Sequence, residues 1–243
     1  MKKIIIGTLV ATSMFAAQVV ELACDKGYAP YSYKDGKVTK GVYVDVIKAV
    51  FDKIPEYDVK FKPMAWKKAI KQVQKGKVIG FFPPYFSKER EAWTKFSEPI
   101  LGETTVIYAK EKLISKKLKF PEDYVGLTVC INRGFTLSGL GGDKFAKMID
   151  GGSIDIKWGN DNKMCLNQLK KNKADFYIND RLIDTKKFPS IKRGTKIKNN
   201  DGYIGFTLKD NFPNKNDVIS KFNETIIKMK KDGEVDSILK KYQ

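Results

Sequence analysis

Residues 42–82 read VYVDVIKAVFDKIPEYDVKFKPMAWKKAIKQVQKGKVIGFF and decide the fold of the chain. Apolar residues recur at helical spacing over 42–54, which predicts a helix with one buried face. A short β-rich run at 59–61 predicts a strand, and a second helical pattern covers 66–76. The apolar run 78–82 predicts another strand. The segment therefore alternates between helices and strands.

The same alternation extends in both directions along the chain. A strand pattern at 19–24 precedes it, so the first part reads β-α-β-α-β, which predicts a parallel sheet covered by helices. A second alternation has strands at 127–131, 154–158 and 175–179 and helices around 144–149 and 162–171. Two further β-rich runs, 104–109 and 203–208, would carry the chain into a second lobe and back, and helices at 222–229 and 235–239 would complete the first. A glycine-rich run at 139–142 is interpreted as a flexible turn. We expect an α/β protein with two lobes.

Composition and the N-terminus indicate an exported globular protein. The chain has 243 residues, of which 42% are hydrophobic and 30% charged, enough for one large domain or two small lobes. A basic start, Met1 to Lys3, is followed by an apolar run to Ala17, the pattern of a secretory signal peptide over 1–17. A retained N-terminal anchor is the alternative.

The net charge of +18 raises the question of a nucleic-acid partner. Nearly all of this charge is lysine, and the only arginines are Arg90, Arg133, Arg181 and Arg193. Proteins that read bases and phosphates favour arginine for its bidentate geometry, and the lysines here are spread over every segment. We therefore expect no nucleic-acid partner, although the positive field can attract anionic ligands or a negatively charged membrane surface.

Several catalytic and metal-binding classes are excluded by residues that the chain lacks. It contains no histidine, which removes Ser-His-Asp and Cys-His nucleophiles and histidine-ligated zinc. Its three cysteines, Cys24, Cys130 and Cys165, form no CxxC motif. We expect no metal site, no cofactor and no enzymatic activity.

Eight ordered segments carry a family resemblance: 25–31 (DKGYAPY), 41–45 (GVYVD), 87–90 (SKER) with 96–99 (FSEP), 126–134 (GLTVCINRG), 174–180 (ADFYIND) and 231–233 (KDG) with 238–242 (ILKKY). In these the chain resembles the bacterial extracellular solute-binding proteins of family 3, which bind polar amino acids for ABC importers. The resemblance covers essentially the whole mature chain. It implies the two-lobed type II periplasmic-binding fold, with lobe 1 formed by 18–106 plus 207–243 and lobe 2 by 107–206.

The resemblance also implies roles for residues that match the family motifs. Arg90 falls on the arginine that clamps a ligand α-carboxylate, Asp180 on the acid that receives its α-ammonium, and Thr136 on a threonine that also contacts the carboxylate. A guanidinium suits a carboxylate because it offers two parallel charge-assisted bonds. The alternatives are a surface arginine, an exposed acid paired with a nearby cation, and a helix N-cap that can coexist with ligand binding.

Three further positions would shape the ligand pocket. Tyr28 and Trp66 match the rings that sandwich the ligand side chain, or they are core aromatics. Asp25 matches an acid that holds a distal cation in binders of basic amino acids, or it is a turn residue. The segment 81–85 (FFPPY) departs from the family, which has small hydroxylated residues there. Tyr85 would fill part of the pocket or donate its hydroxyl, and another small anion could replace an α-amino acid.

A disulfide is the last structural expectation. Within the implied fold, Cys130 lies in the first strand of lobe 2 and Cys165 in a helix of the same lobe, close enough for a bond. Two buried free thiols are the alternative, and Cys24 is expected to be buried and unpaired.

The resemblance implies a function in capture. The protein would be a periplasmic monomer that binds a small polar ligand, an amino acid in first place, and delivers it to an ABC permease at the inner membrane. An exported cyclohexadienyl or prephenate-type dehydratase on the same fold is an alternative, with Glu89 or Asp180 as the acid. A ligand sensor for a membrane receptor is another.

Overall fold

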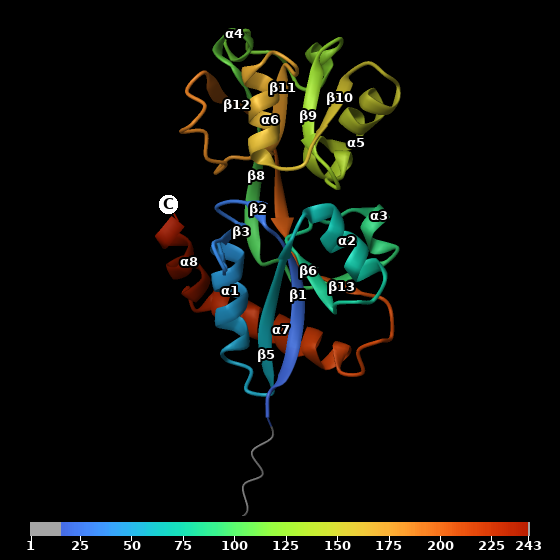
Figure 1. The fold of residues 1–243 in the computed structure, drawn as a ribbon, viewed down its shortest axis with the longest axis vertical. Helices are drawn as coiled ribbons and strands as arrows, with labels where there is room; N and C mark the ends of the chain where they lie inside the picture. The colour runs from blue at the N-terminus through green and yellow to red at the C-terminus, as the bar shows by residue number, and fades with distance from the viewer. Residues whose placement is uncertain (1–15, 243) are drawn as a thin grey trace, which may run out of the picture.

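The computed structural model describes residues 16–242, and these form two groups of elements, one above the other (Figure 1). Most of the expected signal peptide, residues 1–15, lies outside the described residues. None of the helices between residues 16 and 242 combines the length and the apolar character that a membrane span requires.

The lower group in Figure 1 is built on a five-stranded sheet. Its strand order is β5 (Tyr57–Met64), β1 (Gln18–Asp25), β6 (Gly80–Phe82), β13 (Gly205–Thr207) and β7 (Thr94–Phe96). β1 is parallel to β5 and β6, whereas β13 is antiparallel to β6 and β7. The helices are α1 (Val42–Phe51), α2 (Trp66–Gln74), the short α3 (Lys88–Glu91), α7 (Lys215–Lys231) and α8 (Glu234–Leu239).

Both faces of this sheet are buried, as the sequence pattern predicts for a parallel sheet. Leu22 and Cys24 of β1 belong to the core that includes the buried faces of α1 and α7, whereas Ala23 packs with the apolar side of α2. Successive residues of a strand point to opposite faces, so β1 serves both cores.

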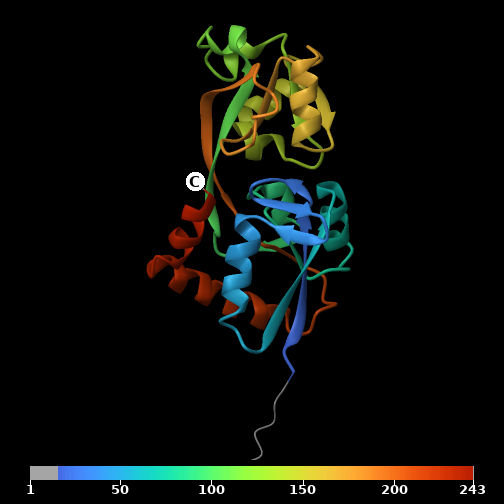
Figure 2. The same cartoon turned by 60° about the vertical axis from the view of Figure 1, so that its left-hand side comes forward.

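A small three-stranded sheet follows β1: β2 (Gly27–Tyr28), β3 (Ser32–Asp35) and β4 (Val38–Lys40). Only its polar turn could be anticipated from the sequence, because strands this short carry no clear alternation. The sheet lies at the end of the lower group that faces the upper group (Figure 2).

The upper group has a second five-stranded sheet. Its order is β10 (Asp155–Gly159), β9 (Thr128–Asn132), β11 (Phe176–Asp180), β8 (Leu101–Lys110) and β12 (Ile191–Gly202). β10, β9 and β11 are parallel, β8 is antiparallel to β11, and β12 is antiparallel to β8. The helical elements are α4 (Glu111–Ile114), η1 (Glu122–Tyr124), α5 (Leu137–Asp150) and α6 (Asn162–Lys170). The lower sheet with its helices is lobe 1, and the upper sheet with its helices is lobe 2. The lobe boundaries at residues 106 and 206 remain predictions from the family resemblance.

The two crossing strands are β8 and β12, which pair along their length and run between the lobes in both views (Figures 1 and 2). The expectation that 203–208 makes the return crossing is wrong, because that run forms β13 inside the lobe 1 sheet. β12 makes the crossing instead. Its sequence, IKRGTKIKNNDG, is polar and mostly exposed or half-buried, so it carries no hydrophobic pattern.

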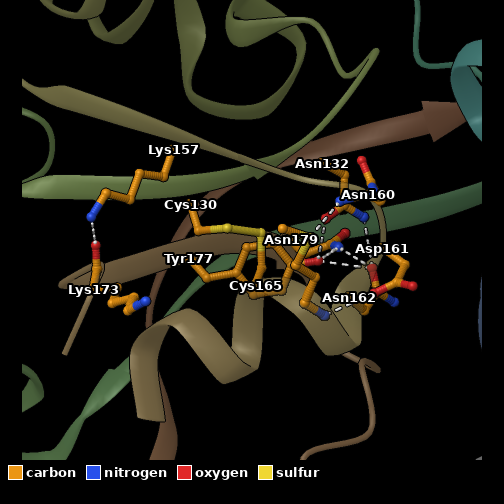
Figure 3. The surroundings of a disulfide bond; sticks show 11 residues. Cys130, Asn132, Lys157, Asn160, Asp161, Asn162, Cys165, Lys173, Tyr177 and Asn179 are labelled. Carbon is orange, nitrogen blue, oxygen red and sulfur yellow. Dashed lines mark hydrogen bonds between the residues drawn. A yellow bond between two sulfur atoms is a disulfide. The ribbon is translucent and has the colours of Figure 1, made fainter. Parts of the chain in front are cut away.

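Two features of lobe 2 complete the fold. The glycine run 139–142, interpreted above as a flexible turn, lies inside α5, where only Gly142 leaves the helical conformation. Cys130 of β9 and Cys165 of α6 form a disulfide with their Cα atoms 5.4 Å apart (Figure 3). Cys24, on β1 of lobe 1, is a buried free thiol.

Candidate ligand-binding cleft

A cavity lies between the lobes, and its empty space, including the part open to solvent, is about 340 Å³. Six of the seven residues that the sequence singles out for the ligand line it: Asp25, Tyr28, Trp66, Tyr85, Arg90 and Thr136. The other lining residues are apolar, namely Pro83, Phe135 and Leu140. The carboxyl end of β1 and the loop after β6 supply the lobe 1 side, which is where ligands bind in open α/β sheets.

Arg90 is a buried cation in this cavity, with 3% of its surface exposed. It lies on α3, whose N-cap Ser87 accepts a hydrogen bond from the Arg90 backbone N–H. The guanidinium donates to the carbonyl of Tyr85 at 3.0 Å and to that of Gly134 at 2.8 Å. No carboxylate of residues 16–242 forms an ion pair with it. Burial lowers the pKa of Arg90 to about 10, so the side chain stays positive at neutral pH.

Gly134 receives contacts across the cleft. Its carbonyl accepts hydrogen bonds from Arg90 and, at 3.2 Å, from Nε1 of Trp66, both in lobe 1. Its φ is +91°, and a Cβ there would lie 3.0 Å from the Trp66 ring, so glycine is required. The guanidinium of Arg90 also lies 5.7 Å from the centre of that ring. The structure therefore shows the lobes in contact.

Asp180 ends β11 and is fully buried, but it does not line the cavity. Its Oδ1 accepts from the Tyr31 hydroxyl and, at 2.7 Å, from the backbone N–H of Leu182. Its Oδ2 accepts from the N–H of Thr104 at 2.7 Å. Burial raises its pKa. The acid expected to receive a ligand ammonium thus has protein donors on both oxygens.

Glu103 of β8 is a buried carboxyl group that sequence reasoning missed. Its Oε1 accepts from the hydroxyl of Tyr43 at 2.5 Å, and its Oε2 from those of Tyr28 and Tyr85, each at 2.7 Å. A Cβ on Gly202 would overlap the Tyr43 hydroxyl, so glycine leaves the space for this contact. Burial, followed by the charge of Asp180, raises the pKa of Glu103 to about 8. No local motif links one acid to three distant tyrosines.

Asp25 ends β1 and lines the cavity with 9% of its surface exposed. Its Oδ1 accepts from the N–H of Gly27 at 2.9 Å, which is the turn role that the sequence leaves open. Within residues 16–242 no other hydrogen bond reaches this carboxylate. Burial raises its pKa to about 7, and the negative charge of Asp161 in lobe 2 adds to the effect.

The aromatic residues and Thr136 frame the remaining walls. Tyr28 stacks on Tyr31 with ring centres 4.9 Å apart. Phe135 of lobe 2 packs edge-on against the ring of Tyr28. Thr136 is the N-cap residue of α5, but its hydroxyl makes no capping bond. The cavity therefore has a cation, a carboxylate and a hydroxyl set in an aromatic lining.

A family model describes this chain over residues 20–243, and its description reads "Bacterial extracellular solute-binding proteins, family 3". The chain belongs to this family. No curated protein matches this family 3 protein.

Solved structures share its fold over nearly their whole length. An ancestral arginine-binding protein bound to arginine has 22% identity and a TM-score of 0.78, covering 94% of this chain and 99% of that chain. A putative L-cystine ABC transporter from Listeria monocytogenes has 19% identity and a TM-score of 0.76, covering 93% and 96%. A histidine kinase sensor domain with similarity to periplasmic binding proteins has 16% identity and a TM-score of 0.77, again covering 93% and 96%. The family 3 protein therefore has the two-lobed periplasmic-binding fold.

Residues 16–242 contain no group of three or more histidine, cysteine or acidic side chains placed to hold a metal ion. Hydroxyl and backbone N–H donors bind the carboxyl groups of Glu103 and Asp180.

Glu103 predicts a pH dependence of stability. Burial raises the pKa of Glu103 from its ordinary value of 4.5 to about 8. Between pH 4.5 and pH 8, the carboxyl group is therefore ionised in the unfolded chain and takes up a proton when the protein folds. Its contribution to stability is thus fully present below pH 4.5 and is lost as the pH rises through 8. We expect the free energy of unfolding to be higher at pH 5.5 than at pH 8.5, with at least about 2 kcal/mol of the difference due to Glu103.

Urea denaturation of the wild type and of Glu103→Gln at both pH values measures this contribution. The neutral amide keeps the shape of the side chain, so the variant should lose part of the pH dependence. An equal pH dependence in the two proteins would show that Glu103 does not change its protonation on folding.

Proposed function

We propose that this protein captures a small ligand that carries a carboxylate, an amino acid or a close relative, in the cleft between its lobes. It works in the periplasm as a monomer and presents the ligand to an ABC importer. The observation that carries the proposal is the guanidinium of Arg90, which is buried in the cavity and has no anionic partner within residues 16–242. A buried charge without a partner is costly, and a ligand carboxylate would remove that cost.

The ligand would stabilise closure by touching both lobes. Arg90 belongs to lobe 1, and its two hydrogen bonds to carbonyl groups leave further N–H donors for a carboxylate. Thr136 and the first turn of α5 belong to lobe 2 and line the same cavity. A ligand shifts the equilibrium toward closure only through contacts that the open form lacks, and these residues can supply them.

Catalysis is less well supported than capture. The dehydratase alternative relies on Glu89 or Asp180 as an acid. Glu89 is exposed on α3, and Asp180 is buried behind its own hydrogen bonds, so neither lines the cavity. The family also consists mainly of binding proteins.

A thermal-shift screen on protein stripped of carried-over ligand tests the proposal. The panel contains the common L-amino acids, small dicarboxylates, ω-amino acids and prephenate. A ligand at a hundred times its dissociation constant should add about 2.7 kcal/mol of stability, a clear rise in the unfolding midpoint. Turnover of prephenate, or no shift with any carboxylate, would count against capture. Uptake of the identified ligand by cells that make the protein and its importer, compared with cells that lack the protein, then separates transport from sensing.

A further inference from the structure

The carboxyl groups around the cleft differ in how far the protein already satisfies them. Glu103 accepts hydrogen bonds from three tyrosine hydroxyls. Asp180 accepts from one hydroxyl and two backbone N–H groups. Asp25, in contrast, accepts only from Gly27 among the described residues, although it lines the cavity and is nine-tenths buried. Among these three carboxyl groups, Asp25 therefore has the most acceptor capacity left for a ligand.

Tyr31 contacts Asp180, the acid that the family resemblance predicts would receive an α-ammonium group. It lies in the turn between β2 and β3 of lobe 1, with 4% of its surface exposed, and its hydroxyl donates to Asp180 of lobe 2. A ligand ammonium at Oδ1 of Asp180 would have to displace this hydroxyl, leaving a buried donor without a partner. The neighbouring loop offers few free acceptors for an ammonium group. The carbonyl of Pro84 accepts from the N–H of Tyr203, the carbonyl of Tyr85 accepts from Arg90, and the Tyr85 hydroxyl donates to Glu103.

The mouth of the cleft carries a pair of acids, one from each lobe. A wider hollow that shares Asp25 and Trp66 with the cavity is also lined by Asp161, the N-cap residue of α6. The two acids are close enough for the charge of Asp161 to raise the pKa of Asp25. Four cations line this hollow, yet none forms an ion pair with either acid within residues 16–242: Lys26, Lys34, Lys67 and Arg133.

Arg90 and Asp25 thus offer opposite charges to one ligand. Both are at least nine-tenths buried, both line the cavity, and neither is ion-paired within the described chain. The rest of the lining is mainly aromatic and apolar, including Tyr28, Trp66 and Phe135. Such walls suit a chain of methylene groups.

We propose that the ligand is an ω-cationic carboxylate without an α-ammonium group, with its carboxylate on Arg90 and its distal cation on Asp25. This inference rests on the proposed function and narrows its ligand class. Lysine without its α-amino group, 6-aminohexanoate, is the simplest probe. Tyr31 sets the specificity because its hydroxyl competes for the acid that an α-ammonium would need.

Calorimetric titration with matched ligands tests the proposal. The pairs are 6-aminohexanoate with L-lysine and 5-guanidinopentanoate with L-arginine, and hexanoate and 1-aminohexane each keep only one charge. Of 6-aminohexanoate and 5-guanidinopentanoate, we expect the one with the higher affinity to bind at least about 10-fold more tightly than its α-amino counterpart. We expect the same minimum difference from hexanoate. A series of ω-amino acids from four to seven carbons measures the span between the two charges.

Two variants assign the effect to residues. Asp25→Asn should remove the preference for 6-aminohexanoate over hexanoate. Tyr31→Phe frees Asp180, so it should narrow the difference between 6-aminohexanoate and L-lysine. Tyr33→Phe, a change of the same type on β3, should leave that difference as it is in the wild type.

Different binding results would contradict the inferred ligand class and the proposed function. If L-lysine or another α-amino acid binds the wild type as tightly as its des-amino form, and Arg90→Ala abolishes that binding, capture stands and the ligand class is wrong. If no carboxylate binds in a manner that depends on Arg90, both are wrong.

Discussion

Replacement of Arg90 by alanine is expected to weaken binding of the carboxylate ligand by at least about 100-fold, because two charge-assisted hydrogen bonds in a buried site are lost. The Arg90 side chain is 3% exposed, and no other basic residue lines the cavity within residues 16–242. No neighbouring cation can therefore replace it. Its hydrogen bond to Gly134 would also be lost, which removes a contact between the lobes.

Calorimetric titration of Arg90→Ala and Arg90→Lys with the best ligand of the screen measures this loss. Lysine keeps the charge but not the planar fork, so Arg90→Lys should recover only part of the affinity. Arg181→Ala serves as the matched control, since Arg181 is exposed and outside the cavity. Unchanged affinity in Arg90→Ala would exclude Arg90 as the carboxylate clamp.

Removal of the disulfide is expected to lower the free energy of unfolding by about 3–4 kcal/mol, because the bond closes a loop in the unfolded chain. Cys130 and Cys165 are 35 residues apart in sequence. For a protein of this size the loss corresponds to a fall in the unfolding midpoint of about 6–16 °C. The measurement is thermal and urea denaturation of the Cys130→Ala/Cys165→Ala double variant, with Cys24→Ala as the control.

The disulfide also supports the lobe 2 side of the cleft. Beside it, Asn162 at the start of α6 accepts hydrogen bonds from Asn132 at 2.8 Å and Asn179 at 3.0 Å (Figure 3). Asn179 in turn accepts from the N–H of Asp180. We therefore expect the double variant to bind ligand more weakly as well as to unfold earlier. A double variant as stable as the wild type would show that the polar cluster alone holds α6 in place.

The α/β alternation was predictable because most strands and helices here bury an apolar face. The pattern over 42–82 matches α1, β5, α2 and β6, since burial forces apolar residues to recur at the period of each element. β12 could not be predicted from the sequence, because it crosses between the lobes with most of its side chains at least partly exposed. Exposed strands are held by backbone pairing, which leaves no trace in the side-chain pattern.

The candidate site was predictable as a set of positions but not as a network of contacts. The family motifs pointed to Arg90 and Asp25, which line the cavity. They could not show that Tyr31 bonds Asp180, 149 residues away, or that Glu103 gathers three tyrosines. Such pairs depend on how the lobes meet, and that geometry follows from the fold as a whole.

A crystal structure of the protein with the best ligand of the screen tests the central claim most directly. The account predicts one ligand per chain between the lobes, with its carboxylate in hydrogen-bond contact with the guanidinium of Arg90 and its body against Trp66. A saturated protein with an empty cleft, or a ligand bound there with its carboxylate turned away from Arg90, would contradict it.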